Sequence, residues 1–143
     1  MPKELEEVKT STKPQSLEEF LMHNPVTLED EVRISDRIPF NFKVKAMDND
    51  LYEELQKRHT KMYRKGKMSF DSMGFNISTI LECCIQPCFK SAEFVKGVGV
   101  ATPEQAVKKV LLPGEIVNLA GAIQELSGFD KGTDELKDEV KNF

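Results

Sequence analysis

The clearest pattern along the chain lies between Leu111 and Asp130, where a break at Pro113-Gly114 is followed by a helical repeat of apolar residues. Steps of three and four residues place these side chains on one stripe of an α-helix. Gly128 stands where a left-handed residue commonly ends a helix, because glycine takes that conformation at little cost. The rest of the molecule or a partner must cover the stripe. It consists of Ile116, Leu119, Ala120, Ile123 and Leu126.

A second pattern, with a period of two, marks residues 31–46. Val32 and Ile34 alternate with polar neighbours, and the alternation resumes after a short link at Ser35-Asp36-Arg37. This period predicts two antiparallel strands that share one buried face. An isolated hairpin is marginally stable in water, so we expect helices to pack on this face. The apolar positions after the link are Ile38, Phe40, Phe42, Val44 and Ala46.

Helix-start signals recur along the rest of the chain. Ser16 to Glu19 reads as a capping box for a short helix that ends at Asn24-Pro25, with Leu17, Phe20 and Leu21 on its apolar side. Residues 89–94 read as a short amphipathic turn, with a short helix as the alternative. Similar caps predict helices from Asp48–Asp50 to about His59, from Asp71 to Gln86, from Thr102 to Leu111 and from Thr133 to about Lys141.

Together these elements predict an α+β fold: a mostly α-helical single domain with one antiparallel β-hairpin or small sheet near the N-terminal third. We expect residues 16–130 to form this domain. Residues 1–15 are polar and lack an apolar period, which is typical of a flexible tail. Residues 131–143 read as an acidic C-terminal helix or tail with few apolar positions.

Composition narrows the class of protein. The chain has 143 residues, of which 39% are hydrophobic and 31% charged, enough apolar residues for one globular core. Its apolar runs are far shorter than a bilayer span, and the N-terminus lacks the apolar stretch of a secretion signal. We therefore expect a cytoplasmic protein without membrane attachment. The net charge of −4 argues against a dedicated nucleic-acid-binding protein.

Three cysteines, Cys83, Cys84 and Cys88, lie within one predicted helical segment. An odd number at this spacing is a poor disulfide framework, so we expect reduced thiols that pack as small hydrophobic side chains. A zinc site usually needs four Cys or His ligands in paired spacings, and His23 and His59 are distant in sequence. No pattern typical of a phosphate loop or a catalytic nucleophile is present. The sequence therefore predicts no metal, no cofactor and no enzyme activity.

The segment from Leu55 to Phe70 carries a basic run without an acidic residue. Cations interleaved with an aromatic residue, here Tyr63, can bind nucleic acid. The run equally fits a docking surface for an acidic protein partner. Because the rest of the chain is largely acidic, head-to-tail self-association into a homo-oligomer is also open. The run consists of Lys57, Arg58, Lys61, Arg64, Lys65 and Lys67.

The order and spacing of several segments resemble the XkdN-like family of phage tail assembly chaperones, typified by a PBSX-type prophage element of Gram-positive bacteria. The resemblance extends from about Ser16 to Asp130 and is strongest at its C-terminal end. The segments that carry it are Ser16–Leu21, Asn24–Val26, Glu31–Arg37, Pro39–Met47, Phe70-Asp71, Pro87–Glu93, Thr102–Glu104, Leu111–Glu115 and Leu126–Asp130.

The resemblance implies a non-enzymatic chaperone that binds the long tape measure protein and keeps it soluble while the tail tube assembles around it, with the tail tube protein as a possible further partner. Two alternatives stay open: a structural tail component, or a small nucleic-acid-binding regulator that uses Lys57–Lys67. Exposed apolar helix would suit a partner helix. Our candidate partner-binding residues are Phe89, Phe94 and Phe129 beside Lys57, Arg58, Lys61, Arg64 and Lys65.

Overall fold

A small antiparallel sheet lies at the base of the molecule in the computed structural model, which describes residues 14–24 and 28–129. Its strand order is β1-β2-β5, with β1 at Glu29–Val32, β2 at Phe42–Lys45 and β5 at Cys84–Gln86. In the register, Val32 pairs with Phe42 and Val44 pairs with Cys84. The predicted antiparallel pairing is therefore confirmed, and β2 is the central strand.

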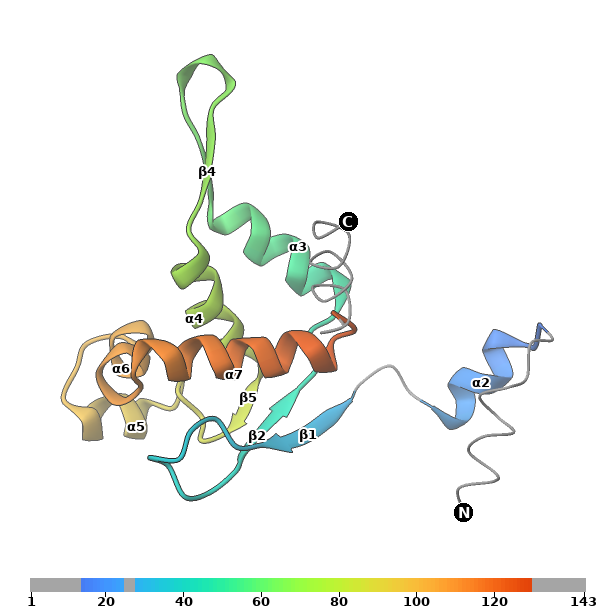
Figure 1. The fold of residues 1–143 in the computed structure, drawn as a ribbon, viewed down its shortest axis with the longest axis horizontal. Coiled ribbons are helices and arrows are strands. Elements are labelled where there is room, and N and C mark those ends of the chain that lie inside the picture. Colours follow the sequence, from blue (N-terminus) through green and yellow to red (C-terminus); the bar gives the residue numbers. More distant parts are fainter. Residues whose placement is uncertain (1–13, 25–27, 130–143) are drawn as a thin grey trace, which may run out of the picture.

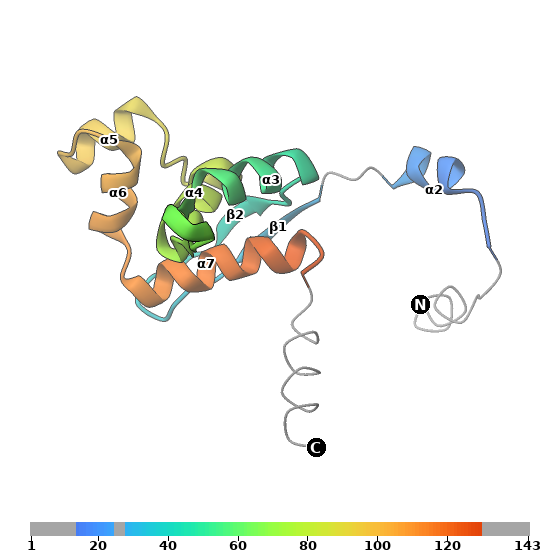
Figure 2. The same ribbon diagram turned by 90° about the horizontal axis from the view of Figure 1, so that it is seen from above.

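One face of the sheet carries the core. Phe42 and Val44 are buried, whereas the intervening Lys43 and the following Lys45 are exposed. Helices α4 (Ser72–Cys83) and α7 (Pro113–Leu126) pack against each other and cover the buried face. Figure 2 shows these helices and α3 (Asn49–Arg58) lying over the strands. The α+β class predicted from the sequence is confirmed.

Helix α7 behaves as its periodicity predicts. Ile116, Leu119, Ala120 and Ile123 are buried, and Gly128 just beyond the helix has a φ of 101°. The predicted left-handed residue after the helix is thus confirmed, and glycine suits this conformation because it has no Cβ. The stripe is covered by the rest of the molecule itself, mainly by α4, so it is part of the core and is not available to a partner.

The predicted caps are also confirmed. Ser16, Asp48, Asp71 and Thr102 each accept a hydrogen bond from a backbone amide in the first turn of the helix that follows. Helices α2 (Leu17–His23) and α6 (Pro103–Val110) begin and end close to the predicted positions. The short turn predicted over residues 89–94 is instead helix α5 (Ala92–Val98), which starts later and includes Gly97. The predicted C-terminal helix and most of the predicted N-terminal tail fall outside the described residues.

Two boundaries differ from the prediction. The first strand ends at Val32, so residues 33–41 form a longer link than expected, and Ile38 and Phe40 lie outside the second strand. The helix predicted to reach Gln86 ends at Cys83, because residues 84–86 become strand β5 and pair with β2. Local periodicity cannot detect this second change, since the partner strand is distant in sequence.

Most of the basic run lies on a β-hairpin. Strand β3 (Thr60–Met62), a short 3₁₀ turn (Arg64–Gly66) and strand β4 (Met68–Phe70) form a separate two-stranded sheet. We call residues 60–70 the arm. Figure 1 shows it projecting from the ends of α3 and α4, away from the rest of the fold. Among the described residues, no helix is long and apolar enough to cross a bilayer.

Candidate partner-binding surfaces

The arm is tied to the body at its root. The Asp71 amide donates to the His59 carbonyl at 2.8 Å, and the Thr60 hydroxyl donates to the Gln56 carbonyl at 2.6 Å. The Phe70 ring lies 5.4 Å from the ring of Phe75, which is buried in the core on α4. These contacts fix where the arm leaves the fold, so its two strands start from a defined position.

Ser78, His59 and Asp71 form a chain at this root that has the residue types of a hydrolytic triad. His59 Nε2 lies 2.8 Å from Ser78 Oγ, but His59 Nδ1 is 4.0 Å from the nearest Asp71 carboxylate oxygen, beyond hydrogen-bond distance. Ser78 is buried in the middle of α4, where the backbone amides already bond along the helix. Such a serine lacks the free amide donors of an oxyanion hole. The contact therefore joins the end of α3 to α4.

At Gly74, in the first turn of α4, the side chains of Asp71 and His59 come close to the helix backbone. A Cβ added there would meet the carboxylate of Asp71 and would lie 2.8 Å from His59 Nδ1. The Asp71 carboxylate is held near by its own hydrogen bond from the Gly74 amide, at 3.0 Å. A residue without a side chain lets the cap of α4 and the end of α3 lie against each other.

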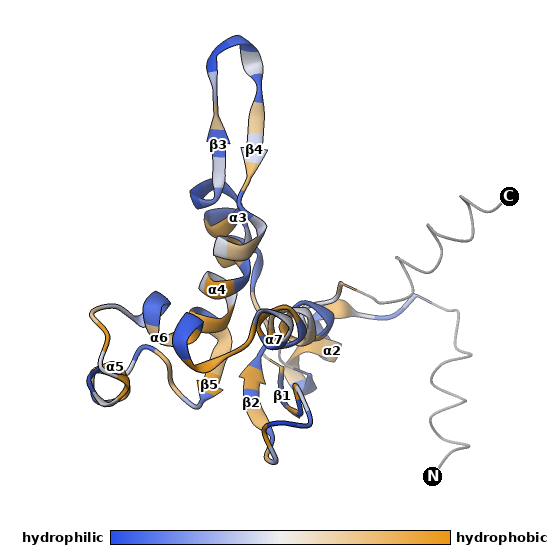
Figure 3. Cartoon of the chain, turned by 60° about the vertical axis from the view of Figure 1, so that its left-hand side comes forward, coloured by the Kyte–Doolittle hydropathy of each residue, from blue (hydrophilic) through white to orange (hydrophobic). Residues whose placement is uncertain are grey.

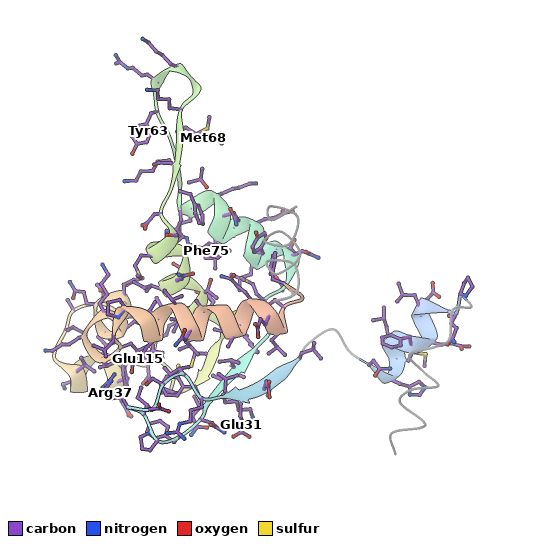
Figure 4. The ribbon with its side chains drawn as sticks, in the orientation of Figure 1. Glu31, Arg37, Tyr63, Met68, Phe75 and Glu115 are labelled. Carbon is purple, nitrogen blue, oxygen red and sulfur yellow. The ribbon has the colours of Figure 1, made fainter. Side chains whose placement is uncertain are left out.

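The two faces of the arm differ in chemistry. Cross-strand partners share a face in an antiparallel pair, and Met62 pairs with Met68 while Thr60 pairs with Phe70. Met62, Met68 and Phe70 therefore lie on one face, which we call the methionine face. Lys61 pairs with Ser69 on the other face, where the Tyr63 hydroxyl lies 3.4 Å from Ser69 Oγ. In Figure 4, Tyr63 and Met68 point to opposite sides of the arm.

The methionine face is open to solvent. Met62 is 73% exposed, Met68 66% and Phe70 45%. Apolar side chains of this size usually bury most of their area, and a contiguous exposed group of them marks an interaction site. No helix covers the arm within the described part of the chain, as Figures 1 and 3 show. The arm is therefore an amphipathic ribbon without a covering layer.

The tip of the arm is a tight basic turn. Lys65 and Gly66 have φ values of 70° and 74°, so two successive residues adopt the left-handed conformation. Figure 3 shows a mainly hydrophilic tip and, below it, two strands in which hydrophilic and hydrophobic residues alternate. None of the ion pairs among the described residues involves Lys61, Arg64, Lys65 or Lys67. Their charges are thus available to an acidic partner.

A second candidate surface is an apolar groove beside the link between β1 and β2. It has a volume of about 410 Å³. Phe40, on its rim, is 59% exposed and stacks on Phe42, with ring centroids 5.9 Å apart. The groove is lined by Arg37, Ile38, Pro39, Phe40, Phe42, Pro87, Phe89, Phe94, Val110 and Leu111.

An ion pair holds one wall of this groove. The buried Glu115 carboxylate at the start of α7 accepts from Arg37 Nε at 2.9 Å, from Ser35 Oγ at 2.6 Å and from the Leu112 amide at 2.8 Å. These hydrogen bonds lower the pKa of Glu115 to about 2, and the bond from Arg37 has the largest effect. Arg37 also donates to the Val110 carbonyl at 2.9 Å. The link is therefore fastened to α7, as Figure 4 shows for Arg37 and Glu115.

Helix α2 is the third exposed apolar element. None of its residues is buried, and Leu17, Phe20 and Met22 are 65%, 56% and 79% exposed. In Figures 1 and 2 it lies to the side of the fold. The apolar side predicted for this helix thus exists, but the described fold does not cover it.

The structure separates the candidate residues predicted from the sequence. Phe89 and Phe94 contact each other in an edge arrangement, with centroids 5.2 Å apart, and both line the groove; Phe89 is only 1% exposed. Phe129 lies past the other end of α7, where its ring is 5.1 Å from that of Tyr52. The three phenylalanines therefore do not form one surface. Their role in partner contact stays a prediction.

The basic candidates divide in the same way. Lys57 and Arg58 belong to α3, and Arg58 is engaged by Glu54 one turn earlier at 2.5 Å. Lys61, Arg64 and Lys65 lie on the arm. Sequence reasoning did not single out Met62 and Met68. The signal that could have found them is the alternation of Met62 and Met68 with Lys61, Tyr63, Lys67 and Ser69 on either side of Gly66.

The cysteines are not alike. Cys83 and Cys84 are buried as predicted, but Cys88 is exposed, so the expectation that all three pack as small hydrophobic side chains is wrong. Burial raises the pKa of the Cys83 thiol to about 11 and that of Cys84 to about 12. Over residues 14–24 and 28–129, no group of three or more His, Cys, Asp or Glu side chains is arranged to hold a metal ion.

Comparison with known proteins places this fold in a class. The chain belongs to the family of phage XkdN-like tail assembly chaperone proteins, whose family model matches residues 17–141. That range begins at α2 and includes the sheet, the arm and the helices that follow. The family resemblance seen in the sequence is therefore confirmed.

Two individual relatives support this assignment. The phage-like element PBSX protein XkdN of Bacillus subtilis (strain 168) is 29% identical over 106 residues, which make up 71% of this chain and 72% of the relative. The crystal structure of the protein YqbN matches with a TM-score of 0.63 and 28% identity, over 82% of this chain and 100% of YqbN.

Proposed function

We propose that this chain acts in the cytoplasm of a bacterial host cell as a non-enzymatic tail assembly chaperone, which binds the tape measure protein and keeps it soluble while the tail tube assembles. Membership of the chaperone family supports the general role. The identity of the partner is our proposal. A tape measure protein has to be long, and apolar helix surface along such a protein needs cover before the tube encloses it.

The observation that carries the proposal is the contrast between a finished core and uncovered apolar projections. The core is closed within the chain, since α7, α4 and β2 bury one another's apolar side chains. Every buried side-chain nitrogen or oxygen in the described residues also has a hydrogen-bond partner. Yet the arm and α2 leave large apolar side chains in water. A chaperone needs this combination, because its own fold stays intact while its exposed side chains contact a client.

Co-expression tests the proposal. The tape measure protein encoded with this chain is produced alone, with the chain, and with an unrelated soluble protein of similar size. We expect the tape measure protein to move from the pellet to the supernatant only with this chain, and to co-purify with it. Equal solubility in all three cultures would refute the proposal.

The same system separates the chaperone from a structural tail component. A chaperone is released before the tail is complete, so purified tails should contain far less of this chain than of the tail tube protein. Quantitative mass spectrometry of purified tails measures this ratio. A fixed stoichiometric ratio in finished tails would favour the structural alternative instead.

A further inference from the structure

We propose that the arm is the client-binding element and that its methionine face binds an acidic amphipathic α-helix of the partner. The inference rests on the proposed function in one respect only: the proposed function says which protein supplies that helix. A two-stranded ribbon with no third strand and no covering helix is marginal in water. Here its strands have three residues each and are joined at their base to α3 and α4. A partner would complete the missing layer.

The chemistry of the methionine face indicates an apolar partner surface of variable shape. Met62 and Met68 are directly opposite each other, and both are more than half exposed. Methionine is unbranched and polarizable, so it adapts to differently shaped apolar side chains. Phe70 continues the face toward the root, where Phe75 supports its ring. The face therefore has an adaptable outer part and a fixed inner part.

The charge of the arm indicates an acidic partner. Lys61, Arg64, Lys65 and Lys67 lie in a segment without any acidic residue, although the whole chain has a net charge of −4. A two-stranded ribbon with about 5 Å between its strands is about 10 Å wide, which is close to the width of a helix with its side chains. A helix on the methionine face therefore extends to both edges of the arm. Its polar flanks come within reach of lysine side chains that start on the opposite face or at the tip.

A helix fits these observations better than a nucleic acid or an added strand. Nucleic-acid phosphates would pair with the cations but would leave Met62 and Met68 in water. A strand added along β3 or β4 would meet only three residues, and its backbone bonds would not use the methionine face. A helix with an apolar stripe and acidic flanks uses both the apolar and the charged side chains.

The test uses the full chain and two synthetic, fluorescently labelled amphipathic peptides. Both peptides have the same apolar stripe, and their polar faces carry Glu in one and Lys in the other. We expect the Glu peptide to bind with a gain in helical circular dichroism, and the Lys peptide to bind at least about tenfold more weakly. Binding of the Glu peptide should also weaken as salt rises, because the cations are exposed.

Variants place the binding site on the arm. The double substitution Met62→Ser with Met68→Ser should weaken binding of the Glu peptide by about tenfold or more, since it removes two apolar contacts. Met22→Ser on α2 is the matched control: it also replaces an exposed methionine, which is 79% exposed, and should leave binding unchanged. All three side chains are exposed, so the variants should fold, which thermal unfolding checks.

Each other outcome overturns the inference. If the two peptides bind with equal affinity, the arm does not select an acidic helix. If Met22→Ser weakens binding of the Glu peptide as much as the double substitution does, the arm is not the binding site. A single-stranded oligonucleotide that binds more tightly than the Glu peptide would make the arm a nucleic-acid site. If light scattering shows dimers that dissociate when the peptide binds, the natural occupant is a second copy of this chain.

The test is independent of the co-expression experiment. If the tape measure protein is solubilised but the arm variants bind the Glu peptide like the wild type, the function stands and the arm inference falls. If the Glu peptide binds through the arm but the tape measure protein stays insoluble, the arm inference stands and the client is another protein.

Discussion

The thiols of Cys84 and Cys88 are close in sequence but lie in opposite environments. Cys84 is buried on strand β5, and burial raises its pKa to about 12, whereas Cys88 is exposed in the loop that follows. The thiolate is the nucleophile in alkylation, so a thiol that is both covered and kept protonated reacts slowly. We expect iodoacetamide at pH 8 to modify Cys88 in the folded protein and to spare Cys83 and Cys84.

Mass spectrometry of the intact protein and of its peptides measures this selectivity. The control is the same reaction in guanidinium chloride, where all three cysteines should be alkylated. Rapid modification of Cys84 in the folded protein would contradict the buried position of strand β5.

The ion pair of Glu115 and Arg37 gives a second prediction at this scale. Its hydrogen bonds lower the pKa of Glu115 to about 2 from an ordinary value of 4.5. A carboxyl group with a lowered folded-state pKa stabilises the fold above its unfolded pKa, and this contribution is lost as the pH falls through the folded pKa. The contribution of Glu115 should therefore be complete above about pH 5 and should disappear between about pH 4.5 and pH 2.

The variant Glu115→Gln isolates this contribution. It should be less stable than the wild type at pH 7, and the difference between the two should shrink as the pH falls through the same window. Urea unfolding at a series of pH values measures it, with Glu104→Gln on the exposed first turn of α6 as the control. A difference that is constant from pH 7 to pH 2 would show that the pKa of Glu115 is not lowered.

Helix α7 makes a prediction at the scale of the element. Ile123 is fully buried on its stripe, while Val117 on the same helix is 51% exposed. Ile123→Ala should reduce the free energy of unfolding by about 2–5 kcal/mol, because it removes buried methyl and methylene groups and leaves a cavity. Val117→Ala should change it by no more than about 0.5 kcal/mol. Urea unfolding compares the two, and similar values would mean that the stripe is not the buried side.

The elements also show why some of the fold was predictable from sequence. Helix α7 has a long repeat and clear end signals, and capping residues such as Ser16 and Thr102 act on the adjacent turn. Those signals are local, so sequence alone reveals them. Strand β5 is the opposite case. Its residues continue a helical pattern, and only pairing with β2, more than a helix length away in sequence, makes them a strand.

The candidate surfaces were predictable only in part, for a related reason. The sequence indicated the basic run, since charge is a property of composition. It did not indicate that Lys61 and Met62 would face opposite ways, because strands β3 and β4 have only three residues each, which is too short for a period of two to stand out beside the charges. For phenylalanines the sequence shows size but not burial. Phe89 lies inside the core and Phe129 on the surface, although each follows the end of a helix predicted from the sequence.

At the scale of the whole molecule, the fold separates a self-sufficient core from its projections. The core joins the sheet to α3, α4, α6 and α7, and its largest buried side chains all come from these parts or from the adjoining Phe89. Helix α2 adds no buried residue. If the projections bind a partner as proposed, stability and partner contact can change independently, because they depend on different side chains.

This separation predicts the effect of removing the apolar side of α2. The double substitution Leu17→Ser with Phe20→Ser should leave the midpoint of thermal unfolding within about 2 °C of the wild type, since both side chains are more than half exposed. Differential scanning calorimetry measures the midpoint, and Ile123→Ala is the control that must lower it. A fall comparable to that control would mean that α2 packs on the core in solution, and its apolar side would then belong to the fold and not to a partner surface.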